Sequence, residues 1–295
     1  MDLIEQFSSG LAERLAAAAP FVVGIHAGRR PTSGILWRPD IVVASEQVLP
    51  KDTSELQVVH GGQTIGAKLA GRDPGTNVAV LKLMTPLRGS VPAAAGDARV
   101  GNLTLVIGAD MTGGATGRLA MVHALGQAWH SMAGGRIDAL IRLDTRLGQD
   151  EGGPVLSLAG GLIGMSTTGP RRRTIVIPAA TLDRVIDPLL TDGRIASGWL
   201  GVGLQPVLLP DSLHQIAACD SGLMVVGLAS GGPAEAAGVL PGDIVLDIDG
   251  SPVSRPRALT ASLGPDRIGQ VAVLRLLRAG AVQPVSVTIA ARPAR

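Results

Sequence analysis

Hydrophobic residues at the start of the chain recur every three or four positions. They are Leu3, Ile4, Phe7, Leu11 and Leu15. This spacing places them on one face of an α-helix, so the pattern predicts an amphipathic helix over residues 2–18. Pro20 interrupts the apolar stretch that follows, and acidic residues stand where a secretory leader carries positive charge. We therefore expect no signal peptide and no membrane insertion. The expected location is cytoplasmic, or extracytoplasmic if a leader has been removed.

From residue 21 to about residue 177 the pattern changes to short apolar runs separated by Gly, Pro and Asp. The clearest runs span residues 21–25, 41–44, 56–59, 78–83, 103–107 and 155–158. Several short strands at this spacing are typical of an all-β barrel or sandwich. The first half of the chain is therefore expected to be a β domain whose loops carry any function.

A helical pattern at residues 179–190 precedes a second unit, because Leu182, Ile186 and Leu189 lie at core-facing spacing. Small and polar residues over 191–198 predict a linker. Beyond it, apolar runs at 199–202, 222–228, 243–248, 271–277 and 285–289 alternate with helical segments at 234–238 and 257–263. We therefore expect an N-terminal helical segment (1–20), a β domain (21–190), and a linker with a second, different domain (191–295).

Composition narrows the possible functions. The chain has 26 basic and 24 acidic residues, a net charge of +2, and 2% aromatic residues with no Tyr. This argues against nucleic-acid binding by charge or by base stacking. A single cysteine, Cys219, excludes an intramolecular disulfide and a multi-cysteine zinc site. The histidines show no ligand-like spacing; they are His26, His60, His123, His130 and His214. We expect no metal, no cofactor and no nucleic-acid partner.

Five segments carry a more specific signal. "TSGILWRPDIVVASEQVL", "GRDPGTNVAVLKL" and "GQDEGGPVLSLAGGLIGMSTTG" follow one another in the order in which trypsin-like serine proteases of the HtrA/Deg family present their His, Asp and Ser segments. "GWLGVGL" and "GGPAEAAGVLPGDIVLDIDGSPV" are similar to the PDZ domain that follows the protease in that family. The resemblance implies a mainly β fold: a trypsin-like double β-barrel followed by a PDZ domain, which is a small α+β fold.

The resemblance also identifies the three catalytic positions, and each is substituted. Gln47 stands at the general base, Asn77 at the orienting Asp and Glu151 at the nucleophile, while Gln149 replaces a Gly of the oxyanion-hole loop. Acyl transfer needs an oxygen nucleophile, a base that takes its proton near neutral pH, and a carboxylate that orients the base. Two amides and a weakly nucleophilic carboxylate cannot supply these, so we expect no active catalytic residue. Glu151 is expected instead to accept hydrogen bonds from the backbone amides of its own loop.

Two clusters of charge lie near this loop. Asp144, Asp150 and Glu151 form an acidic cluster that is interpreted either as an acid–base or cation site or, more simply, as a solvated loop paired with Arg146 or with the run Arg171 to Arg173. For the arginine run itself, a charged turn between strands is the favoured interpretation over an anion site.

The second unit keeps its recognisable chemistry. By the resemblance, Trp199, Leu200, Gly201 and Val202 form the loop whose amides receive a peptide carboxylate, and Leu204 continues the strand that the peptide pairs with. Leu259 and Leu263 are expected on one face of a helix that walls the pocket, although core packing explains them equally well.

The leading hypothesis is a non-catalytic HtrA-like pseudoprotease that binds peptide or protein C-termini through its PDZ domain. The alternatives are an active HtrA-like serine endopeptidase that acts on unfolded proteins, as in protein quality control, and a structural subunit of mixed HtrA-type oligomers. The resemblance further implies a homo-trimer, for which the apolar stripe of the N-terminal helix is the candidate interface.

Overall fold

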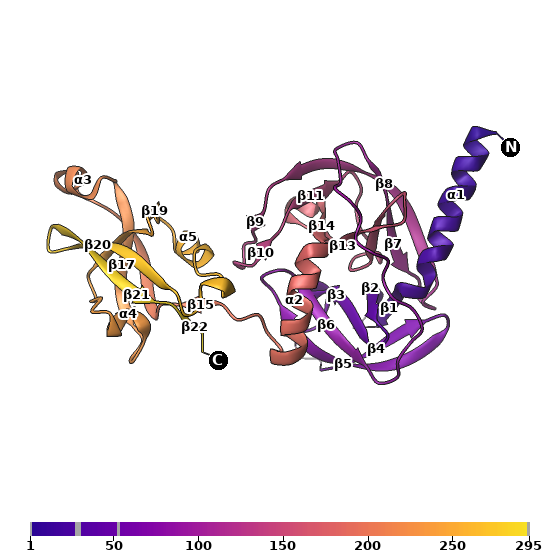
Figure 1. Ribbon diagram of the computed structural model, residues 1–295, viewed down its shortest axis with the longest axis horizontal. Helices are drawn as coiled ribbons and strands as arrows, with labels where there is room; N and C mark the ends of the chain where they lie inside the picture. Colours follow the sequence, from indigo (N-terminus) through magenta and orange to yellow (C-terminus); the bar gives the residue numbers. More distant parts are fainter. Residues whose placement is uncertain (1, 27–30, 52–53, 294–295) are drawn as a thin grey trace. The chain divides into compact units, whose positions relative to one another are not determined.

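The computed structural model describes residues 2–26, 31–51 and 54–293 (Figure 1). The chain divides into two compact units, Met1–Ile195 and Ala196–Arg295. The first unit extends beyond residue 190 because its last helix continues to Asp192.

The first unit begins with a six-stranded closed barrel. Its strands pair antiparallel in the order β1-β2-β3-β6-β5-β4, and β1 closes the barrel against β4. The strands are β1 (Val22–His26), β2 (Pro31–Arg38), β3 (Ile41–Ser45), β4 (Glu55–His60), β5 (Gln63–Asp73) and β6 (Val78–Leu83). Two 3-10 turns, Ala19–Phe21 and Glu46–Val48, precede β1 and follow β3.

A second closed barrel follows, in the order β11-β14-β13-β12-β7-β8. Its strands are β7 (Leu103–Ala109), β8 (Ala115–Gly126), β11 (Leu140–Leu143), β12 (Pro154–Ser157), β13 (Leu162–Thr168) and β14 (Thr174–Pro178). The short strands β9 (Trp129–His130) and β10 (Arg136–Ile137) pair with each other, and the 3-10 turn Pro170–Arg172 connects β13 to β14. The expected double β-barrel is therefore confirmed.

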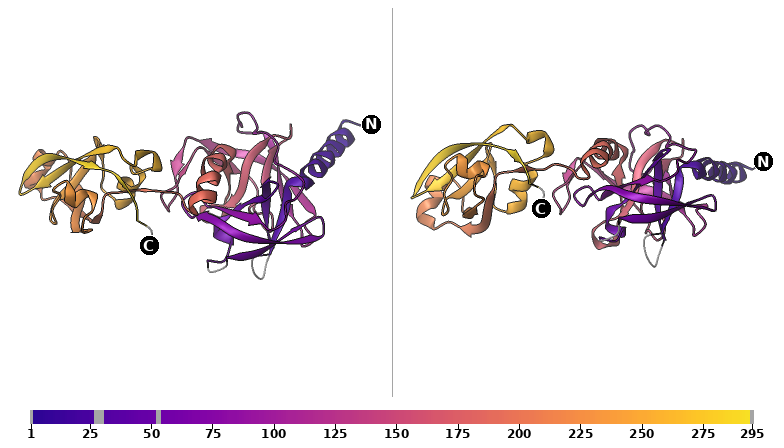
Figure 2. Two further views of the ribbon diagram at one scale, coloured as in Figure 1. Left: turned by 60° about the horizontal axis from the view of Figure 1, so that its bottom comes forward. Right: turned by 90° about the horizontal axis from the view of Figure 1, so that it is seen from below.

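Helix α2 (Ala179–Asp192) covers both barrels, because it contacts β5 and β6 of the first and β13 and β14 of the second (Figure 2). Leu182, Val185, Ile186 and Leu189 are fully buried. Burying an aliphatic side chain of this size contributes about 1.5–3 kcal/mol, so this face is a substantial part of the packing. The helix ends at Gly193, whose φ of 70° is a left-handed conformation that glycine adopts without strain.

The N-terminal helix α1 (Leu3–Ala18) is only partly covered. Leu11 and Leu15 pack on the core of the first unit, and the helix contacts β7 and β8. Leu3 is 77% exposed, Ile4 75% and Phe7 45%, in the part of the helix that projects from the barrels in both views of Figure 2. Among the residues that the structure describes, no helix combines the length and apolar character needed to cross a membrane.

The second unit is built on a sheet in the order β16-β17-β18-β20-β21, with β19 paired to β18. Its strands are β15 (Gly198–Trp199), β16 (Val202–Leu208), β17 (Ser221–Leu228), β18 (Ile244–Ile248), β19 (Ser251–Pro252), β20 (Val271–Arg278), β21 (Ala281–Thr288) and β22 (Ala290–Ala291), of which β15 pairs with β22. Its helices are α3 (Asp211–Ala217), α4 (Pro233–Ala236) and α5 (Pro256–Ala261), and the 3-10 turn Pro265–Arg267 follows α5.

Within residues 199–202, Gly201 takes a left-handed φ of 77° and separates β15 from β16. The bounds expected for one helix of this unit need correction. The helix expected at 257–263 ends at Ala261, so Leu263 lies in the turn that follows it.

Candidate functional site

The three positions that correspond to a catalytic triad meet between the two barrels of the first unit. The turn after β3 carries Gln47, the residue before β6 is Asn77, and the loop before β12 carries Glu151. Strand β13 of the second barrel contacts β3 of the first and supplies Thr167 and Thr168. The three positions identified from the sequence motifs, Gln47, Asn77 and Glu151, therefore lie together in the structure.

Asn77 holds the turn that carries Gln47. Its Oδ1 accepts a hydrogen bond from the Gln47 backbone amide at 2.8 Å, and its Nδ2 donates to Thr167 Oγ1 at 2.6 Å and to Ser45 Oγ at 3.1 Å. Its φ of 59° lies in the left-handed region. Among residues other than glycine, Asn is one of the few that commonly adopt this conformation. Asn77 therefore acts on the backbone and on two hydroxyls, with no imidazole to orient.

Gln47 and Glu151 bind each other directly. Gln47 Nε2 donates to Glu151 Oε1 at 2.5 Å and to the Thr168 carbonyl at 2.9 Å, and Thr167 Oγ1 lies 3.1 Å away. An amide nitrogen has no lone pair that takes a proton in this pH range, so Gln47 is a hydrogen-bond donor here and not a base.

The Glu151 carboxylate faces β13 and not the amides of its own loop, which corrects the sequence-based expectation. Oε1 accepts from the Thr168 backbone amide at 3.1 Å, and Oε2 accepts from Thr168 Oγ1 at 2.7 Å. The backbone amide of Glu151 instead donates to the Gly148 carbonyl at 3.4 Å. The loop thus closes on itself, and the carboxylate accepts hydrogen bonds from Thr168 on β13 and from Gln47.

The remaining loop geometry depends on two glycines that follow Glu151. Gly152 has a φ of 89°, and a Cβ there would lie 2.3 Å from the Ser33 carbonyl oxygen. A Cβ on Gly153 would lie 1.9 Å from the Ile107 carbonyl oxygen, so only glycine fits either position. Gln149 is exposed and outside the left-handed region, and its carbonyl accepts from Ser33 Oγ at 2.6 Å.

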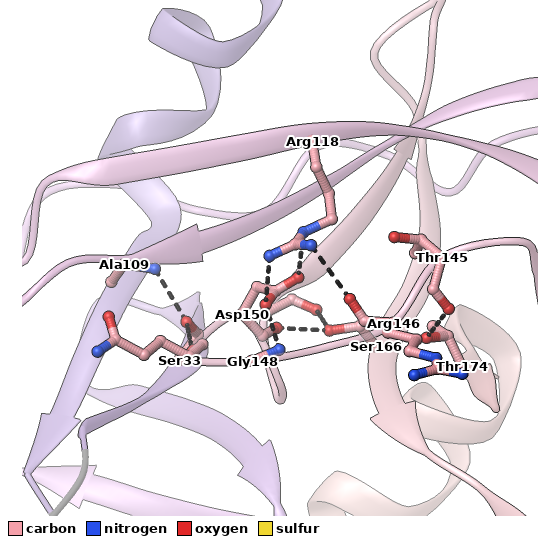
Figure 3. A network of polar contacts seen from close by, with 11 residues as sticks. Ser33, Ala109, Arg118, Thr145, Arg146, Gly148, Asp150, Ser166 and Thr174 are labelled. Carbon is pink, nitrogen blue, oxygen red and sulfur yellow. Dashed lines mark hydrogen bonds and ion pairs between the residues drawn. The ribbon is translucent and has the colours of Figure 1, made fainter. Parts of the chain in front are cut away.

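The acidic cluster expected from the sequence does not exist as a unit. Asp150 is 5% exposed and pairs with Arg118 of β8, whose Nε lies 2.9 Å from Oδ2 and whose Nη2 lies 3.2 Å from Oδ1 (Figure 3). The Gly148 amide donates to the same Oδ1 at 2.7 Å. Asp144 accepts from the Met121 amide at 2.8 Å instead. Arg118, which the sequence did not single out, therefore anchors the loop, in place of Arg146 or the run Arg171 to Arg173.

The second unit has a cavity of about 210 Å³ between the edge strand β16 and helix α5. Every residue that the sequence assigned to peptide binding lines it: Trp199, Leu200, Gly201, Val202, Leu204, Leu259 and Leu263. Leu259 (3% exposed) and Leu263 (6%) also belong to the core, so these two leucines both line the cavity and pack in the interior of the unit. Pro256, Thr260 and Arg292 complete the lining and were not anticipated. Arg292 directly follows β22, which pairs with β15, so a contact between distant segments brings it to the cavity.

Comparisons with known families agree with this geometry. Residues 32–165 match the trypsin-like peptidase domain, and residues 198–289 match the PDZ domain. A probable periplasmic serine endoprotease, DegP-like, of Brucella suis is 32% identical over 262 residues, and one of Rhizobium meliloti is 30% identical over 263 residues. These alignments cover 85% of this chain but 50% and 51% of the relatives, so the chain spans about half their length.

Solved structures show the same fold over nearly the whole chain. The HtrA-type protease AlgW with a decapeptide has a TM-score of 0.72 at 23% identity and covers 96% of this chain and 99% of its own. AlgW with a tripeptide has a TM-score of 0.70 at 25% identity, covering 96% and 98%. The curated relatives are named periplasmic, so the expectation of a cytoplasmic location receives no support.

Proposed function

Starting from the HtrA/DegP-like organisation of this chain, a trypsin-like peptidase domain followed by a PDZ domain, we propose that it is a non-catalytic protein that binds peptide C-termini. One observation carries the proposal: the three triad positions hold an amide, an amide and a carboxylate, and these are hydrogen-bonded to one another and to β13. Two of the hydroxyls around these side chains, those of Ser45 and Thr167, belong to residues that are 0% and 1% exposed, so neither reaches a substrate. The third, that of the partly exposed Thr168, donates to the Glu151 carboxylate.

Binding is assigned to the cavity of the second unit. Strand β16 is at the edge of its sheet, where a peptide can add as a further strand, and the turn at Gly201 lies at one end of it. Backbone amides of such a turn receive a carboxylate, while the leucines in the cavity favour an apolar last residue. We therefore propose free protein C-termini that end in an apolar residue as the ligands, and an extracytoplasmic location like that of the named relatives.

Proteolysis assays test the catalytic half of the proposal. Purified protein is incubated with unfolded casein and, separately, with a fluorophosphonate probe; no cleavage and no labelling are expected. The alternative, an active serine endopeptidase as the relatives are named, predicts cleavage and labelling that disappear on mutation of a single residue. Thr168→Val is the informative variant, because Thr168 is a partly exposed hydroxyl bound to the Glu151 carboxylate.

Restoring the triad residues tests whether the substituted side chains or the backbone of the Glu151 loop prevent catalysis. Gln47→His, Asn77→Asp and Glu151→Ser together are expected to give little activity, because the amide at position 151 already binds the Gly148 carbonyl. Adding Gln149→Gly is expected to raise the activity by allowing the loop to rearrange. Robust proteolysis by the triple variant alone would show that the oxyanion hole is intact.

Peptide titration tests the binding half. A peptide with an apolar C-terminal residue and a free carboxylate is expected to bind, and its C-terminal amide is expected not to bind, because the turn then loses its anionic partner. Equal affinity for the two forms contradicts the assignment. Failure of both forms to bind favours instead a structural subunit of mixed HtrA-type oligomers, which co-purification with an active relative would detect.

A further inference from the structure

The turn between β13 and β14 is built from three consecutive arginines in an unusual backbone. Arg171 and Arg172 have φ values of 58° and 57°, a left-handed conformation that side chains other than glycine rarely adopt. The turn is closed by the Gly169 amide, which donates to the Arg173 carbonyl at 2.7 Å, and Thr174 Oγ1 ties its end to the Thr145 carbonyl at 2.7 Å. All three arginines are exposed. The turn therefore holds three cations in place at a cost in backbone strain.

Two other segments bring further arginines to the same place. Arg142 of β11 and Arg146 in the loop after it line one cavity of about 410 Å³ together with the three arginines of the turn. His123 of β8 and Asp144 are also in its wall. The cavity thus gathers five guanidinium groups and one carboxylate from segments that lie far apart in the sequence.

These cations have few acidic neighbours, because Asp144 is the one carboxylate among the residues that line the cavity. In the part of the chain that the structure describes, no carboxylate forms an ion pair or side-chain hydrogen bond with any of the five guanidinium groups. The Nε of Arg142 is buried and has no hydrogen-bond partner. Like charges held together in this way repel one another and do not stabilise the fold. Each planar guanidinium group can, however, donate two parallel hydrogen bonds to the oxygens of a carboxylate.

We propose that this cavity binds an acidic peptide segment, one with successive Asp or Glu side chains, of a partner protein. The volume suits several carboxylate groups better than one small ion, and the five donors are spread over three segments. The lining contains no Phe, Tyr or Trp, the side chains that most often form stacking platforms for nucleic-acid bases, so an acidic peptide is the favoured ligand. This site is distinct from the cavity beside β16 and does not depend on the proposed function. It also reverses the sequence-based preference for a plain charged turn.

The test uses the full chain and a fluorescein-labelled peptide with four alternating Glu and Asp residues and an amidated C-terminus, followed by fluorescence anisotropy. Amidation removes the group that the PDZ cavity is proposed to bind, so the result is independent of that proposal. We expect saturable binding that weakens at least tenfold in high salt, and no binding of the same peptide with Gln and Asn in place of Glu and Asp.

Variants locate the binding. Arg171→Gly with Arg172→Gly removes two charges at positions whose φ suits glycine, so the turn keeps its shape, and at least a tenfold loss of affinity is expected. Arg142→Gln, on a strand, is an independent second variant with the same expectation. Arg88→Ala removes an exposed arginine elsewhere in the unit and is expected to leave binding unchanged.

The outcomes decide the proposal. Unchanged affinity in both cavity variants, an equal loss with Arg88→Ala, or equal binding of the Gln and Asn peptide overturns it. Saturable binding of inorganic phosphate with no binding of the acidic peptide also overturns it, because the site then recognises a small anion. Gly201→Val is expected to leave the acidic peptide bound, which separates this site from the PDZ cavity.

Discussion

Removing the side chain of Arg118 tests whether its pairing with Asp150 holds the loop that carries Glu151. The side chain of Asp150 is 6% exposed and that of Arg118 47% exposed, so the carboxylate is buried and the guanidinium is about half open to water. Arg118→Ala leaves a buried carboxylate whose remaining donor is the Gly148 amide. An uncompensated buried group of this kind costs about 1–3 kcal/mol, and the exposure of the arginine places the expected value near 2 kcal/mol.

Urea or thermal unfolding of the first unit measures this change. Trp37 and Trp129 lie in the first unit and Trp199 in the second, so fluorescence in a Trp199→Phe background reports the first unit alone. For a domain of this size, about 2 kcal/mol corresponds to a decrease in Tm of about 4–8 °C. Arg118→Lys is expected to lose about half as much, because a single ammonium cannot reproduce the two contacts of the guanidinium.

A double-mutant cycle measures the interaction energy between Arg118 and Asp150 apart from the other effects of each substitution. Asp150→Asn keeps an acceptor for the Gly148 amide but removes the charge, so Arg118→Ala is expected to cost less in that background by about 1 kcal/mol or more. If Arg118→Ala unfolds within 1 °C of the unmodified protein, or if the two changes are additive, the loop is held by its glycines and backbone contacts and not by the ion pair.

Three further predictions concern other parts of the chain. Gly201→Val is expected to abolish binding of a free C-terminus in a calorimetric titration, because valine cannot take a φ of 77° without strain; binding as tight as before contradicts this. In the second unit, burial alone would raise the pKa of Asp243, but hydrogen bonds from Arg278 and a backbone amide prevail and hold it below its ordinary 3.8. A lowered folded-state pKa contributes stability above the unfolded-state value that is lost as the pH falls below it, so calorimetry is expected to show this unit losing stability below about pH 4, less so in Arg278→Gln. Light scattering is expected to show an oligomer that becomes a monomer when residues 1–18 are deleted, since the exposed stripe of α1 needs a cover; a monomer in both cases rejects this interface.

The parts of the site that were predictable from sequence are those encoded by local motifs. Gln47, Asn77 and Glu151 were located because each stands at a fixed place relative to a strand or a Gly-Gly-Pro turn. The PDZ residues were found for the same reason: the run at 199–202 and the leucine at position 259 sit next to recognisable turns and helices.

The parts that were missed depend on contacts between distant segments. Asp150 and Arg118 are 32 residues apart and meet because β12, which follows the loop of Asp150, pairs with β7, and β7 pairs with β8, which carries Arg118. The direction of the Glu151 carboxylate depends on the position of Thr168 on a strand whose pairing no local pattern specifies. The cavity that joins Arg142 and Arg146 to the run at 171–173 was also missed, because these residues come together only after the barrel closes.

The hydrogen bonds around Glu151 have a consequence for any ligand that approaches this side chain between the two barrels. Gln47 comes from the first barrel, and Glu151 and Thr168 come from the second, so their contacts bridge the two. An extended peptide that bound to these donors and acceptors would have to displace their present partners. Each hydrogen bond gained in this way contributes only about 0.5–1.5 kcal/mol to the free energy of binding. The polar groups of Gln47, Glu151 and Thr168 are thus already paired with one another, and the protein's own side chains compete with any main-chain ligand at this place.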